Sequence, residues 1–127
     1  MKLSYLITIA AIGLVFSSNC AGAVEIYEAR KLPPSVKSAT LEISNDGVGQ
    51  MKIERYDGVV KLVAGKVMHK TDNFIFEVTS GENKALKYEF IWQFKGLLSY
   101  WVCQSCIKGG LYGVNAPDES GYIWLKK

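Results

Sequence analysis

Two cysteines near the C-terminal end of the chain are the residues best suited to do chemistry. Cys103 and Cys106 form a C-x-x-C pair within the stretch YWVCQSCIKGGLYG, residues 100–113. A pair with this spacing can act as a thiol–disulfide redox centre, supply half of a zinc site, or close as a short structural disulfide. The elements around the pair decide between these three chemistries.

The redox hypothesis requires a helix that begins at the first cysteine. Thioredoxin-type pairs are reactive because the first thiol lies at a helix N-terminus, where the helix dipole stabilises the thiolate. Gly109 and Gly110 follow shortly after Cys106, and glycine disfavours a helix. The sequence therefore predicts no helix at the pair, and an oxidoreductase using Cys103 and Cys106 is the least favoured function.

A zinc site and a structural disulfide make different demands on the chain. Structural zinc takes four ligands, but the sequence has no second cysteine pair of this spacing and one histidine, His69. We expect no metal and no other cofactor. A disulfide between Cys103 and Cys106 closes a short loop, worth about 2 kcal/mol in the chain-entropy model, so it would fix one turn. This disulfide is the chemistry that the sequence favours.

Aromatic and basic residues surround the expected turn. Tyr100, Trp101 and Tyr112 flank it, and Lys108 lies within it. Because aromatic side chains dominate binding hot spots, these four residues are the candidate binding surface. The alternative is that the aromatic side chains belong to the core.

The N-terminus has the features of a secretory signal peptide. Lys2 precedes an uncharged apolar run at residues 6–16, and Ala21-Gly22-Ala23 provides a small-x-small cleavage site. The apolar run is shorter than the roughly 20 residues that a membrane-spanning helix needs. We therefore interpret residues 1–23 as a signal that is cleaved after Ala23, which leaves no membrane span in the mature chain.

A lipid anchor at Cys20 is disfavoured. Ser17 and Asn19 occupy positions where a lipoprotein signal usually has leucine and a small residue. Cys20 is thus expected to leave with the signal, and the mature protein is expected to be secreted or periplasmic. Paired cysteines oxidise in such compartments.

The mature chain has the size of one domain. Without Lys2 it has 14 basic and 12 acidic residues, a net charge of +2, with no run of like charges. Nucleic-acid-binding proteins usually carry a clustered basic face, so we expect no nucleic-acid partner. Residues 24–38 are expected to form an N-terminal arm or short helix that Pro33-Pro34 ends, and residues 39–127 a single β-domain.

Short strand-like runs separated by turn signals fill the β-domain. Along residues 86–94, apolar side chains alternate with mostly polar ones, which is the period of a β-strand. Turn signals recur about every ten residues, and Asp57-Gly58 is the strongest hairpin signal. The expected strands are residues 39–44, 49–56, 59–64, 66–70, 73–79, 85–94, 98–103, 110–114 and 121–126.

The sequence therefore predicts an all-β fold. We expect a small antiparallel meander of about 7–9 short strands that closes as a barrel or half-barrel. A two-layer β-sandwich is the alternative. Small secreted β-barrel inhibitors and lipocalin-like carriers share this general plan, although the chain has no diagnostic motif of either.

The sequence provides no positive support for catalysis. It has no nucleophile elbow and no phosphate-binding loop, so we expect a protein that is not an enzyme. The leading hypothesis is a binding domain whose partner is another protein, such as an inhibitor or immunity-type factor. The alternative is a lipocalin-like carrier of a small apolar ligand. The expected lining of such a carrier is Phe74, Phe76, Tyr88, Phe90 and Trp92.

Overall fold

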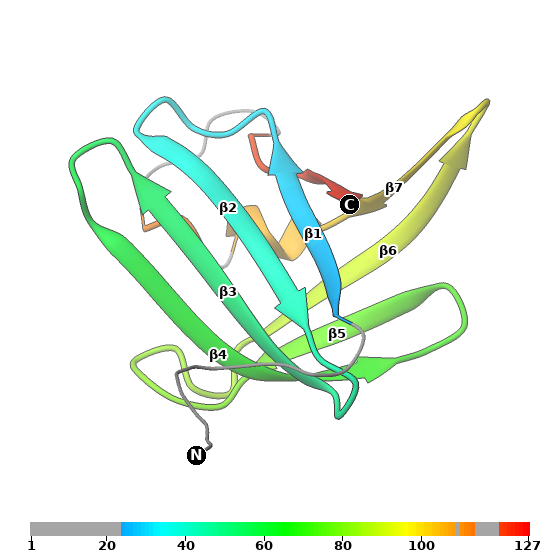
Figure 1. The fold of residues 1–127 in the computed structure, drawn as a ribbon, viewed down its shortest axis with the longest axis horizontal. Coiled ribbons are helices and arrows are strands. Elements are labelled where there is room, and N and C mark those ends of the chain that lie inside the picture. Colours follow the sequence, from blue (N-terminus) through cyan, green and yellow to red (C-terminus); the bar gives the residue numbers. More distant parts are fainter. Residues whose placement is uncertain (1–23, 109, 114–119) are drawn as a thin grey trace, which may run out of the picture.

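The described residues, 24–108, 110–113 and 120–127 of a computed structural model, form a closed antiparallel barrel of eight strands (Figure 1). Consecutive strands pair with each other, and the last strand pairs with the first. The expected signal peptide, residues 1–23, lies outside the described residues. The elements are β1 (Glu25–Arg30), β2 (Val36–Ile43), β3 (Val48–Arg55), β4 (Val60–His69), β5 (Asn73–Val78), β6 (Lys87–Lys95), β7 (Leu98–Val102), α1 (Gln104–Lys108) and β8 (Ile123–Lys126).

The pairing of β1 with β8 confirms the expected barrel and excludes the sandwich. Tyr27 lies opposite Lys126 and Ala29 lies opposite Trp124 in this pairing. Residues 25–30, expected to belong to an N-terminal extended segment or short helix, are therefore the strand that closes the barrel. Tyr27 and Ala29 are buried while their neighbours are less so, which is the alternation of a strand with one face on the core.

Other expected boundaries also differ from the structure. β2 begins at Val36, inside the segment expected to precede the β-domain. Gly65, which separates the expected strands 59–64 and 66–70, lies inside β4. A Cβ at Gly65 would come within 2.7 Å of the Phe76 ring, so this glycine serves close packing instead of a turn. Residues 110–113, expected to begin a strand, form turns.

Aromatic rings fill the interior of the barrel. Phe74 of β5 stacks on Phe90 of β6, with ring centroids 4.6 Å apart and an interplanar angle of 7°. Tyr27 of β1 lies 5.3 Å from Phe74, and Trp124 of β8 lies 5.3 Å from Phe90. Because these strands are spread around the barrel, the ring contacts cross its interior.

The segment after β7 completes the core. Cys103, Cys106, Leu111 and Tyr112 are all fully or almost fully buried. This segment includes α1. Among the described residues, no helix has the length and apolar character needed to cross a membrane.

The β6–β7 hairpin extends beyond the barrel. β5 pairs with β6 only as far as Ile91, and β8 pairs with β7 only from Trp101. Farther out, β6 and β7 pair with each other, as far as Lys95 and Leu98. Residues 92–100 therefore project as a two-stranded ribbon, which we call the arm (Figure 1, yellow at the upper right).

Candidate functional site

A disulfide joins Cys103 and Cys106 where β7 passes into α1. The two Cα atoms are 5.4 Å apart, and both residues are fully buried. The Cys103 N–H donates to the Tyr122 carbonyl oxygen at 2.8 Å, which holds this end of β7 against the segment before β8. The disulfide therefore fixes one turn at the base of the arm.

The prediction that no helix accompanies the cysteine pair is wrong. α1 begins directly after Cys103 and contains Cys106. Gly110 has a φ of +67°, a left-handed conformation that glycine adopts easily and that commonly ends helices. The glycine-rich segment after Cys106 therefore does not prevent a helix of about one turn.

This short helix does not give the cysteines the access that redox catalysis needs. Thiol–disulfide exchange requires an attacking thiolate to reach one of the sulfur atoms, and both cysteines have an exposed fraction of zero. Among the described residues, no group of three or more His, Cys, Asp or Glu side chains could hold a metal ion. The geometry favours a structural role for the pair.

One of the expected binding residues, Tyr112, does not lie on the surface. Tyr112 is buried, its hydroxyl donates to the Gly121 carbonyl oxygen at 3.0 Å, and burial raises its pKa. Tyr112 is therefore a core residue and offers no surface to a partner. Lys108 is the last residue of α1, and its side chain lies outside the described part of the chain. Tyr100 and Trp101 are half-buried in β7.

Trp101 connects the arm to the core. Its ring lies 5.7 Å from Tyr27 in an edge-to-face arrangement and 5.0 Å from Phe74. Its neighbours across the two flanking strands are Trp92 and Trp124. The arm therefore starts from a base of packed aromatic rings.

The arm carries a cluster of exposed apolar side chains. Leu97 is fully exposed, and Leu98, Phe94 and Trp92 are 69%, 66% and 40% exposed. The rings of Trp92 and Phe94 lie 6.0 Å apart. Single exposed apolar residues are normal on protein surfaces, whereas several on one short element are typical of an interaction site. We call Phe94, Leu97 and Leu98 the tip.

The expectation that Trp92 lines the interior is wrong. The other four expected interior residues are buried, namely Phe74, Phe76, Tyr88 and Phe90. Trp92 lies on the same face of β6 as Phe90. The hairpin has left the barrel at Trp92, so this face of β6 is exposed to solvent there. One signal of the arm was present in the sequence: Gly96-Leu97-Leu98 is an apolar turn, whereas turn residues are normally polar.

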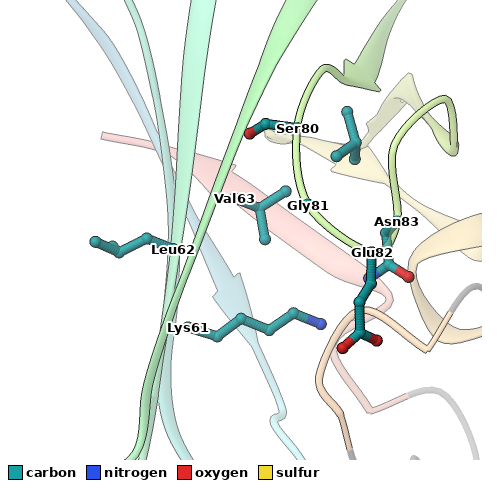
Figure 2. Close-up of a pocket in the computed structure, with 8 residues that line it drawn as sticks. Lys61, Leu62, Val63, Ser80, Gly81, Glu82 and Asn83 are labelled. Atoms are coloured by element: carbon teal, nitrogen blue, oxygen red, sulfur yellow. The ribbon is translucent and has the colours of Figure 1, made fainter.

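An open groove of about 350 Å³ lies between β4 and the loop at residues 80–83. Lys61 and Glu82 extend into it from opposite walls (Figure 2). The Lys61 Nζ donates to the Leu111 carbonyl oxygen at 3.1 Å, so this amine already holds the segment that follows α1. The groove has no aromatic lining residue and offers a partner less apolar contact than the arm.

Comparison with known proteins identified no relative: no family model, no curated protein and no solved structure matches the chain. The function of the site is therefore inferred from its geometry.

Proposed function

We propose that this protein is an exported, non-catalytic binding domain and that the arm is its binding element. The observation that carries the proposal is the cluster of exposed apolar side chains on a hairpin that projects from the barrel (Figure 1). Gly96, with a φ of +63°, supplies the conformation that the two-residue turn needs. A polar residue at position 97 would serve this turn equally well. A target that covers the tip explains why leucine is present instead.

The base of the arm supports a fixed orientation. The Glu89 N–H of β6 donates to the Ser105 Oγ of α1 at 2.9 Å, and the disulfide between Cys103 and Cys106 ties α1 to the end of β7. α1 therefore braces both strands of the hairpin. A binding element that is already ordered loses less conformational entropy when it meets its target.

A target outside the barrel agrees with this geometry better than a small ligand inside it. The rings of Tyr27, Phe74 and Phe90 contact one another in the interior, which leaves the lipocalin-like hypothesis without specific support. A protein partner, as expected from the sequence, would use Trp92 and Phe94 as hot-spot residues.

The test compares an arm variant with a matched surface control. Leu97→Ser/Leu98→Ser removes the two leucines of the tip, and Leu62→Ser removes an exposed leucine of β4, far from the arm in sequence. Each protein is immobilised and exposed to the native extracellular or periplasmic fraction, membranes included. We expect a component that wild type and Leu62→Ser retain and that the arm variant loses. Equal retention by all three proteins would contradict the proposal.

A further inference from the structure

We infer that the arm docks on a lipid membrane surface with anionic head groups. This inference rests on the proposed function, in which the arm is the binding element, and it names the target. Three features of the arm favour lipid over a protein surface: the distribution of its apolar side chains, their order along the arm, and the charge at its end.

The apolar side chains surround the end of the arm. Residues that lie opposite each other in an antiparallel pair share a face of the ribbon. Phe94 pairs with Ser99, and Lys95 pairs with Leu98, so Phe94 and Leu98 lie on opposite faces, and Leu97 lies at the turn between them. A protein that docks on a ribbon covers one face, whereas lipid surrounds an inserted end from all sides.

The order of side chains along the arm matches the layers of a membrane interface. At a rise of about 3.3 Å per residue, Leu98 lies about 10 Å beyond Trp101. Interfacial elements bury their apolar groups about 5–10 Å deep. If the side chains of the tip reach the acyl region, Trp92 and Tyr100 lie at head-group level. Tryptophan and tyrosine concentrate at this level of a membrane.

The backbone of the arm sets the depth of insertion. The Trp92 N–H points away from β7, because it donates to the Asp72 carbonyl oxygen at 2.8 Å. Backbone groups alternate in direction along a strand, so the N–H and C=O of Phe94 also point away from β7, where β5 no longer pairs. Hydrocarbon does not tolerate unpaired backbone groups. The backbone of Phe94 and of the turn therefore stays at the hydrated level, and the side chains of the tip extend deeper.

Lys95 gives the end of the arm a positive charge. It is exposed, and no carboxylate in the described part of the chain forms an ion pair with it. Its long apolar stem allows the amine to reach back to the head groups while the neighbouring side chains remain in the acyl region. Anionic lipids attract a cation in this position.

The test uses the mature chain and vesicles of defined lipids. One set contains phosphatidylethanolamine and phosphatidylglycerol, and the other contains phosphatidylcholine alone. Sedimentation with the vesicles measures binding, and tryptophan emission reports insertion. Of the three tryptophans, Trp124 is buried, Trp101 is half-buried and Trp92 is the most exposed. A blue shift on binding should therefore disappear in Trp92→Phe.

We expect wild type to bind the anionic vesicles and its emission to shift to the blue. Leu97→Ser/Leu98→Ser should weaken this binding by on the order of tenfold or more, because two leucines lose their apolar contact. Lys95→Gln should weaken binding about fivefold on anionic vesicles and leave binding to phosphatidylcholine unchanged. Leu62→Ser should bind as wild type does.

Absence of vesicle binding by wild type, or equal weakening by Leu62→Ser, would overturn the inference. If the capture experiment then yields a protein that is retained through the tip, the proposed function stands and the target is a protein. If neither vesicles nor any captured component depends on the tip, the proposed function fails as well.

Discussion

Trp92 and Trp101 lie opposite each other on β6 and β7, at the point where the hairpin leaves the barrel. Trp101 packs against Tyr27 and Phe74, whereas Trp92 contacts Phe94 on the arm. One tryptophan of the pair thus belongs to the fold, and the other belongs to the surface that we assign to binding.

The two tryptophans should therefore differ in their effect on stability. Trp101→Ala removes ring contacts with the core and should lower the free energy of unfolding by about 2 kcal/mol, less than a fully buried tryptophan would. Trp92→Ala should lower it by less than about 1 kcal/mol, because the side chain is 40% exposed on the arm. Urea unfolding of both variants measures the difference. A loss of unfolding free energy larger than this for Trp92→Ala would show that the Trp92 side chain contributes to the core.

Loss of the disulfide should loosen the arm more than the barrel. Cys103→Ser/Cys106→Ser removes a short cross-link, worth about 2 kcal/mol, and frees α1 from the end of β7. Trypsin cleavage after Lys95 in the arm should become faster than in wild type, because cleavage requires local opening. Unchanged cleavage at Lys95 would mean that the disulfide does not brace the arm.

The buried tyrosines should make stability fall in alkali. Burial raises the pKa of Tyr112. Burial also raises the pKa of Tyr27, and the negative charge of Glu25 is the second cause. Their neutral forms therefore stabilise the folded state fully below the unfolded pKa of about 10, and this contribution is lost as the pH rises above it. Denaturant unfolding across this range measures the decline.

Tyr112→Phe isolates the contribution of one hydroxyl. At neutral pH the variant should lose about 1 kcal/mol, because the Gly121 carbonyl oxygen loses its donor. Above pH 10 its stability should decline less steeply than that of wild type. A decline as steep as in wild type would assign the alkaline effect to other groups.

Close packing at Gly65 should make this position intolerant of any side chain. A Cβ there would lie 2.5 Å from the Glu77 carbonyl oxygen as well as against the Phe76 ring. Gly65→Ala should therefore cost about 2–3 kcal/mol through overpacking. Gly58→Asn is the control: nothing lies within 4 Å of its Cβ position, and asparagine tolerates a positive φ. Similar thermal unfolding of the two variants would contradict the packing at Gly65.

The sequence predicted those parts of the fold that depend on local pattern. Alternation in β5 and β6 placed Phe74, Phe76, Tyr88 and Phe90 on the inner face, and Asp57-Gly58 marked the turn between β3 and β4. The sequence does not predict α1, because Gly109-Gly110 disfavours a helix. It does not predict Gly65 inside β4 either, because the Phe76 ring that excludes a side chain there belongs to another strand.

The arm could not be predicted by the same means. Whether Trp92 faces the core or solvent depends on where β5 and β8 stop pairing with the hairpin, at Ile91 and Trp101. These end points are set by contacts with other strands, which the alternation within β6 does not reveal. The apolar turn at residues 96–98 was the available local signal.

Hydrogen exchange with and without vesicles of phosphatidylethanolamine and phosphatidylglycerol tests the assignment of the arm most directly. The vesicles should slow exchange of backbone amides at residues 92–100 and leave those of β2 and β3 unchanged. Slower exchange at the β3–β4 turn without any change in the arm would contradict the account, as would no difference anywhere in the chain.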